Sequence, residues 1–277
     1  MTTLLSYCAT DGHVHVFGDR QTYPMTPNRH YTPGQADVPA LRTHLLNCNI
    51  DRVVLIQPSV YGTDNRCMLD AVKRLGNATR GVAVVDSDAS YSVLERLVEQ
   101  NVRGLRLNLE SSGQHASEQI QRNVCAWLAA MRALGMHLQI YAAFSTIIHS
   151  LTWLDTLKTP VVLDHFAMIP LSKSDKELDI RALCDRIAEG NYYIKLSAPY
   201  RISNDDQDQG HIIELAHRLI QSNPNRMLWA SDWPHTNRVP NIHPLEVSPF
   251  RKVSSKSICA QWEAWGIDSQ RCSAYCV

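Results

Sequence analysis

Short apolar runs of strand length recur along the whole chain, and most of them are followed by a segment with helical periodicity. The runs at residues 53–56 and 161–163 are continuously apolar, which is typical of parallel strands that are buried on both faces. This pattern predicts eight strands, at residues 9–16, 52–59, 80–86, 102–109, 137–142, 161–166, 192–197 and 227–232.

The segments between these strands carry apolar residues three or four positions apart, as one face of a helix requires. The clearest of them is apolar at positions 120, 124, 127, 128, 131 and 134 and then reaches Gly135, a residue that commonly ends helices. Eight alternations of strand and helix predict a (β/α)8 TIM barrel, in a single domain that spans residues 1–277. An open, doubly wound sheet is disfavoured because no Gly-x-Gly-x-x-Gly or Walker loop follows a strand.

Composition and charge narrow the class of protein. The 277 residues are 44% hydrophobic and 19% charged, and their formal net charge is zero at pH 7. A neutral chain without basic clusters lacks the electrostatic footprint of a nucleic-acid-binding protein. No apolar run approaches the ~20 residues that a membrane-spanning helix needs, and the first residues do not resemble a signal peptide. We therefore expect a cytoplasmic monomer or small homo-oligomer that binds neither nucleic acid nor a membrane.

Eight cysteines are scattered along the chain, and none of them forms a Cys-x-x-Cys pair. This spacing favours free thiols in a reducing compartment over a disulfide framework or a zinc ribbon. The eight are Cys8, Cys48, Cys67, Cys125, Cys184, Cys259, Cys272 and Cys276.

Histidine and aspartate residues stand at the ends of three predicted strands. In a (β/α)8 barrel the chemistry takes place at the C-terminal ends of the strands, so these positions are the first candidates for a site. His13 and His15 end the first strand, and because side chains alternate along a strand, both imidazoles are expected on the same side. His165 ends the sixth strand and Asp232 ends the eighth. We predict that these four residues form the catalytic centre.

The residues around these positions form four recognisable segments, which read DGHVH at 11–15, LDHFA at 163–167, IKLS at 194–197 and ASDWPH at 230–235. Together they resemble the 2-pyrone-4,6-dicarboxylate lactonase group of the amidohydrolase superfamily, from about residue 11 to about residue 250. The resemblance implies a hydrolase of a small anionic lactone, either a pyrone dicarboxylate or a sugar-acid lactone, with a role in the catabolism of aromatic compounds.

The pattern at strands four and five bears on whether a metal ion is needed. Metal-dependent amidohydrolases usually carry a lysine or glutamate at strand four and a histidine at strand five. Here the fourth strand carries Arg106, and His137 begins the fifth strand instead of ending it. This departure favours catalysis without a cofactor, as the lactonase resemblance also implies. The alternative is a zinc-dependent hydrolase or decarboxylase with His13, His15, His165 and Asp232 as metal ligands.

Arginines near two strand ends are predicted to bind the substrate, because a guanidinium suits a carboxylate bidentately. They are Arg106 and Arg201. Further hydrogen-bonding candidates are Tyr141, Ser59 and Tyr31. Tyr31 lies in a long loop at residues 18–36, which is expected to fold over the site.

These assignments predict a mechanism. Asp232, ionised as a free aspartate is at neutral pH, takes a proton from the attacking water. His13, His15 and His165 donate hydrogen bonds to the lactone carbonyl, where negative charge develops.

The C-terminal segment, about residues 250–277, departs from the family pattern. Relatives usually end with a last helix and an Asn-Pro-x-Arg-Leu-Tyr type of segment, which this chain lacks. The departure predicts a poorly covered outer face on the eighth strand. It also keeps open a different class of function, a non-catalytic binding protein or a decayed enzyme.

Overall fold

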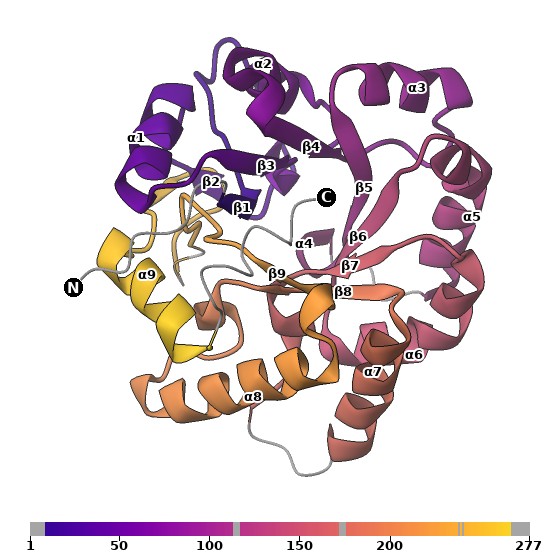
Figure 1. Ribbon diagram of the computed structural model, residues 1–277. Coiled ribbons are helices and arrows are strands. Elements are labelled where there is room, and N and C mark those ends of the chain that lie inside the picture. The colour runs from indigo at the N-terminus through magenta and orange to yellow at the C-terminus, as the bar shows by residue number, and fades with distance from the viewer. Residues whose placement is uncertain (1–8, 113–116, 172–175, 238, 240, 267–277) are drawn as a thin grey trace. The chain divides into compact units, whose positions relative to one another are not determined.

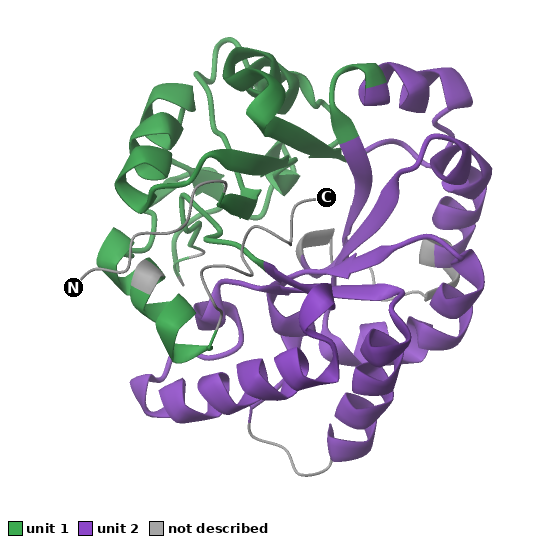
Figure 2. Ribbon diagram, in the orientation of Figure 1, with its two compact units in different colours: residues 1–84, 99–102, 229–277 green, residues 85–98, 103–228 purple. Residues whose placement is uncertain are grey.

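The computed structural model describes residues 9–112, 117–171, 176–237, 239 and 241–266. The chain forms two compact units (Figure 2). The first comprises residues 1–84, 99–102 and 229–277, and the second comprises residues 85–98 and 103–228. Cys8, Cys272 and Cys276 lie outside the described residues, whereas Cys48, Cys67, Cys125 and Cys184 are free thiols, as expected.

Eight strands follow one another in chain order in one sheet, and the pairs within each unit are parallel. Each coincides with a predicted strand but is shorter than expected, and nearly all the missing residues lie at the C-terminal end. The strands are β1 (Thr10–Val14), β3 (Arg52–Ile56), β4 (Thr79–Ala83), β5 (Val102–Asn108), β6 (His137–Tyr141), β7 (Val161–Leu163), β8 (Tyr192–Leu196) and β9 (Met227–Trp229).

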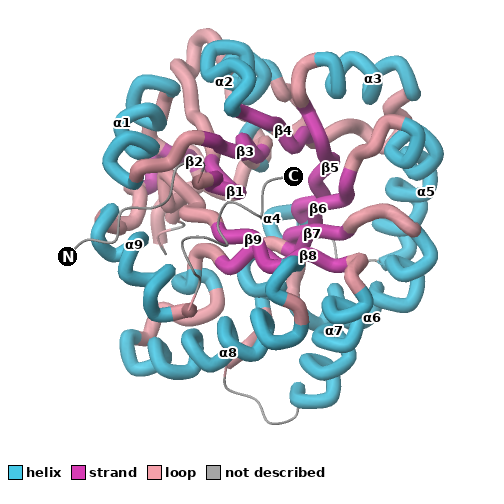
Figure 3. Tube along the Cα trace, in the orientation of Figure 1, coloured by secondary structure: helices cyan, strands magenta, loops and turns pink. Residues whose placement is uncertain are grey.

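Helices separate successive strands along the chain (Figures 1 and 3). The alternation of parallel strands and helices is the (β/α)8 class, and the predicted fold class is confirmed. The helices are α1 (Val38–Cys48), α2 (Arg66–Leu75), α3 (Tyr91–Glu99), α4 (Leu109–Ser112), α5 (Ser117–Ala133), α6 (Phe144–Leu154), α7 (Glu177–Glu189), α8 (Gln209–Ser222) and α9 (Ser255–Ala264). Across the described part of the chain, none of these helices has the length and apolarity needed to cross a membrane.

Local sequence explains where several helices begin and end. The Asp37 carboxylate accepts a hydrogen bond from the Ala40 backbone N–H and so caps the first turn of α1. Gly190 ends α7 in the left-handed conformation that glycine adopts without steric cost. These caps fix the helix boundaries, so each following strand enters the sheet at a defined residue.

The C-terminal helix α9 corrects one prediction. Its Trp262 ring lies 4.3 Å from the ring of Trp229 at the end of β9, and both side chains are buried. Ile258 and Trp265 are buried as well. The expectation that the outer face of the last strand is poorly covered is therefore wrong, because Trp262 of α9 packs on Trp229 of that strand without the family's usual segment. Residues 267–277 lie outside the described part.

The long segment at residues 18–36 is held by a strand pairing and by side-chain hydrogen bonds to other parts of the first unit. Its strand β2 (Thr32–Pro33) pairs with β10 (Val247–Ser248), and the Thr32 hydroxyl donates to the Pro244 carbonyl at 2.7 Å. The Tyr23 hydroxyl donates to Asp70 on α2, also at 2.7 Å. These contacts define the segment's course; its expected closure over the site stays a prediction.

Candidate active site

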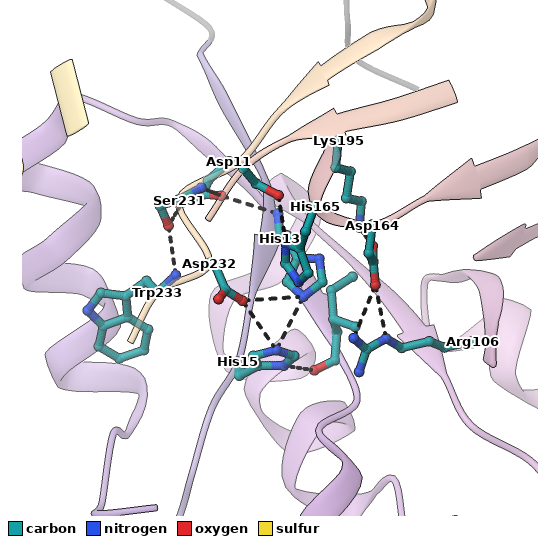
Figure 4. A network of polar contacts seen from close by, with 12 residues as sticks. Asp11, His13, His15, Arg106, Asp164, His165, Lys195, Ser231, Asp232 and Trp233 are labelled. Carbon is teal, nitrogen blue, oxygen red and sulfur yellow. Dashed lines mark hydrogen bonds and ion pairs between the residues drawn. The ribbon is translucent and has the colours of Figure 1, made fainter. Parts of the chain in front are cut away.

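Three buried side chains of the first unit converge near the C-terminal ends of β1 and β9 (Figure 4). The Nε2 atoms of His13 and His15 are 3.2 Å apart, and each lies 3.7 Å from Oδ1 of Asp232. The structure thus brings together three of the four residues predicted to be catalytic. The two imidazoles meet as the alternation along the strand predicted, although the β1–β3 pairing changes register between Asp11 and Val14.

The hydrogen bond made by Nδ1 of His15 defines the tautomer of the neutral imidazole ring. Nδ1 of His15 lies 2.8 Å from the Ile56 carbonyl oxygen. Because a carbonyl only accepts hydrogen bonds, Nδ1 carries the proton. In the neutral ring, Nε2 therefore presents a lone pair towards His13 and Asp232. This nitrogen is arranged to accept a proton or to bind a cation.

The same three atoms fit a divalent metal ion. Zinc is held tetrahedrally at about 2.0–2.2 Å by nitrogen and oxygen ligands, so its ligand atoms lie roughly 3.4 Å from one another. The separations between the Nε2 atoms and Oδ1 of Asp232, 3.2 and 3.7 Å, match that spacing. The Nδ1 bond of His15 to a carbonyl is also the usual support of a metal-ligating histidine. His13, His15 and Asp232 would hold such an ion, which would supply Lewis-acid activation of water.

Backbone strain marks the ends of β7, β8 and β9. Asp232 has a φ of 62°, and Ala198, after β8, has a φ of 46°. After β7, all four residues from 165 to 168 have φ values between 49° and 55°. A non-glycine residue in this left-handed region costs about 1–3 kcal/mol, and such residues cluster at functional sites. The expected strand ends at 166, 197 and 232 were too long because the chain turns sharply at these positions.

A buried ionic network lies in the second unit, next to β7 (Figure 4). Arg106 on β5 donates to Oδ2 of Asp164 from Nε and Nη2, at 3.3 and 3.1 Å. Gln139 on β6 donates to the same oxygen at 3.1 Å. Lys195 on β8 lies 3.4 Å from Oδ1 of Asp164 and donates to the Gln139 side-chain oxygen at 2.8 Å. These four side chains carry two positive charges and one negative charge, an excess that favours an anionic ligand.

Sequence reasoning missed Gln139 and Lys195. The register of the sheet pairs Arg106 with Gln139 directly, and Lys195 is almost completely buried within β8. A polar side chain in an apolar strand was the available signal. The sequence does not reveal that both belong to one network, because its members come from β5, β6, β8 and the position that follows β7.

A second group in the same unit gathers around Tyr141 at the end of β6. The guanidinium carbons of Arg106 and Arg201 lie 5.7 and 5.9 Å from the centre of its ring, within cation–π range. His165 meets the ring edge-on, with the ring centres 5.1 Å apart, and its Nδ1 is 2.9 Å from the Ser197 hydroxyl. The structure therefore brings together the two arginines, Tyr141 and His165 that sequence reasoning selected.

The two remaining candidates occupy the first unit. Ser59 is half-buried at the start of a 3₁₀ turn, Ser59–Tyr61, that follows β3. Tyr31 is half-buried directly before β2. Their role in substrate binding stays a prediction.

The fold and these side chains are those of an amidohydrolase: residues 10–246 match the amidohydrolase family model, and the chain belongs to this family. It is 32% identical to a 2-pyrone-4,6-dicarboxylate hydrolase of Comamonas testosteroni, over 83% of this chain and 77% of that protein. It is 28% identical to a 4-sulfomuconolactone hydrolase of Hydrogenophaga intermedia, over 83% and 78% of the two chains. The predicted family resemblance is confirmed, and these relatives are lactone hydrolases, the predicted class of enzyme.

A solved structure supports the fold assignment. It is a Pseudomonas putida protein to which 2-pyrone-4,6-dicarboxylic acid hydrolase activity is ascribed, with a TM-score of 0.81 and 26% sequence identity. The similarity covers 98% of this chain and 94% of the other.

Proposed function

We propose that this protein opens the ring of a small anionic lactone by adding water to its carbonyl group. The observation that carries the proposal is the placement of two guanidiniums, those of Arg106 and Arg201, on one tyrosine ring, Tyr141. Arg106 is paired with Asp164, but Lys195 adds a second positive charge beside that carboxylate. This group together with Arg201 suits a substrate with two anionic groups better than a substrate with one. A dicarboxylate such as 2-pyrone-4,6-dicarboxylate, the substrate named for the Comamonas relative, is therefore the first compound to test.

In the proposed reaction, Asp232 acts as the general base. Its carboxylate accepts a proton from water as the water oxygen bonds to the lactone carbonyl carbon. The bond from that carbon to the ring oxygen then breaks, and the ring oxygen takes up the proton that Asp232 accepted, which restores the carboxylate. One lactone and one water give one ring-opened hydroxy acid, in its enol or keto form.

The imidazoles of His13, His15 and His165 are proposed to stabilise the negative charge that develops on the carbonyl oxygen. Because Nδ1 of His15 already donates to Ile56, its Nε2 can donate only when the ring is protonated. Oδ1 of Asp232 lies 3.7 Å from this nitrogen. Removal of one donor to a developing oxyanion typically costs about 10²–10³ in rate.

In (β/α)8 enzymes the catalytic residues come from the C-terminal ends of several different strands. Arg106, Arg201 and Tyr141 would bind and orient the anionic groups, with Ser59 and Tyr31 as additional hydrogen-bonding residues. The cytoplasmic location and the oligomeric state stay predictions.

A second candidate function is a zinc-dependent hydrolysis or decarboxylation at the same residues. The tetrahedral spacing of the two Nε2 atoms and Oδ1 of Asp232 favours it. Both candidates use Asp232, so the requirement for a metal distinguishes them.

The deciding experiment follows the ultraviolet absorbance of 2-pyrone-4,6-dicarboxylate after addition of the purified protein, with and without a chelator. We expect decay that survives chelation, and no decay with the Asp232→Asn variant, which should still bind the substrate. Decay that is lost on chelation and restored by zinc would establish the metal-dependent alternative. If no decay occurs with this compound, with 4-sulfomuconolactone or with sugar-acid lactones, even after zinc is added, the proposal fails and a non-catalytic role is favoured.

A further inference from the structure

Asp11 is a completely buried carboxylate that the proposed reaction does not use. Its Oδ1 accepts hydrogen bonds from the backbone N–H groups of His13, at 3.2 Å, and Ser231, at 2.9 Å. Its Oδ2 accepts a short hydrogen bond from the Ser231 hydroxyl. One carboxylate therefore links β1 to the segment that follows β9, the two places from which His13 and Asp232 come (Figure 4).

The Ser231 hydroxyl extends this link to the other side of Asp232. Its oxygen accepts a hydrogen bond from the Trp233 backbone N–H at 2.9 Å. Asp232 itself donates its N–H to the His13 carbonyl at 3.0 Å. The peptide groups on both sides of Asp232 are thus held, and Asp232 takes a φ of 62°, which a free aspartate seldom adopts.

His44 on α1 supports Asp11 from the other side. Its Nε2 lies 3.6 Å from Oδ2 of Asp11, and its ring stacks on Trp233 with the centres 5.7 Å apart. Burial alone would lower the pKa of His44, but its contacts with Asp11 and Cys48 raise the pKa to about 9. At neutral pH a positive charge therefore faces the buried carboxylate.

We propose that Asp11 is a positioning residue, which acts through Ser231 to hold the Asp232 carboxylate between the imidazoles of His13 and His15. Backbone hydrogen bonds from Asp232 to His13 and from His15 to Trp233 also hold this left-handed turn. The Asp11–Ser231 link is the side-chain contact that fixes the peptide groups before and after Asp232. A relaxed turn would move Oδ1 away from the two Nε2 atoms, and a displacement of about 1 Å in a catalytic group can cost ~10²-fold in rate.

The test compares two serine-to-alanine variants. Ser231→Ala removes the hydroxyl that joins Asp11 to Trp233, while Ser150→Ala removes an equally buried hydroxyl that donates to the Thr146 carbonyl within α6. We expect kcat to fall about ten- to hundredfold in Ser231→Ala, with KM changed by less than about threefold. Ser150→Ala should keep the wild-type kcat. Asp11→Asn, which keeps an acceptor for the two backbone groups but cannot accept the Ser231 hydroxyl, should follow Ser231→Ala.

A crystal structure of Ser231→Ala gives a readout that needs no substrate. We expect Asp232 to leave its left-handed conformation and its Oδ1 to move away from both imidazoles. The kinetic readout rests on the proposed function, but the structural one does not. If the wild type opens no lactone, the proposed function fails and the crystal structure still decides this inference. The inference is overturned if Asp232 keeps its conformation in the variant, or if kcat in Ser231→Ala equals that in Ser150→Ala.

Discussion

Two arginines of the same strand allow anion binding to be tested at the level of a single residue. Arg106 is almost completely buried beside Asp164, whereas Arg103 is half-buried and donates to the Val98 carbonyl. Arg106→Met should raise KM for the dicarboxylate about ten- to hundredfold, because a charge-assisted hydrogen bond contributes about 1.5–3 kcal/mol. Arg103→Met is the matched control and should leave KM unchanged. Equal KM values for the two variants would remove Arg106 from substrate binding.

The charge of His44 makes a pH-dependent contribution to stability. Its pKa is raised from 6.5 to about 9 in the folded protein. A group with a raised folded pKa stabilises fully below its unfolded pKa, and the stabilisation is lost as the pH rises through the folded pKa. His44→Gln should therefore lower the free energy of unfolding by an amount on the order of 3 kcal/mol at pH 6, and by much less at pH 9.5.

Denaturant unfolding of both proteins at the two pH values measures this difference. His149→Gln, which changes an exposed histidine on α6, is the control and should show no such pH dependence. An equal loss of stability in His44→Gln at pH 6 and pH 9.5 would contradict a charged His44.

Individual residues also show what the sequence could and could not predict. His13, His15 and Asp232 could be selected from the sequence because their types, strand numbers and spacing are characteristic, and the structure brings them together. Asp11 shares the DGHVH segment with two of them, but its role depends on a hydrogen bond to Ser231, which lies 220 residues further along the chain. Such a partner is fixed only by the tertiary structure.

Several elements of this fold end at a residue in the left-handed backbone conformation, and Lys158 allows the steric cost of that conformation to be tested. Lys158 is exposed and follows the short helix Asp155–Leu157 with a φ of 48°. Glycine adopts this conformation without steric cost. Lys158→Gly should therefore raise the free energy of unfolding by about 0.5–1 kcal/mol, even though glycine is more flexible in the unfolded chain.

Lys158→Ala is the control, because it removes the same charge and keeps a side chain with a Cβ atom. Its stability should stay close to that of the wild type in the same denaturant experiment. A Lys158→Gly variant that is no more stable than Lys158→Ala would show that the backbone at this position carries no steric cost.

The elements themselves were well predicted where periodicity alone determines them. The apolar run of β7 and the helical spacing of α5 gave the correct elements, and α5 ends shortly before Gly135, as predicted. The strand ends were less accurate, since the turn after β9 is set by hydrogen bonds from β1. These hydrogen bonds join residues far apart in the chain, so the local sequence does not predict them.

At the scale of the whole molecule, the regular alternation of elements was sufficient to predict the fold class, since few arrangements bury eight apolar strands flanked by helices. The C-terminal prediction was wrong because it relied on a missing family segment. It did not consider that Trp262 of α9 can cover the last strand by a different contact, on Trp229.

The pairing of β2 with β10 shows that the end of the family match is not the end of the folded structure. The family match ends at residue 246, one residue before β10 (Val247–Ser248) begins, and α9 lies entirely beyond it. A chain cut at that point would keep every residue of the match and lose the partner of β2 and the aromatic cover of β9. The family match is thus shorter than the stretch whose elements contact one another. Truncations and fusions should therefore be placed after α9.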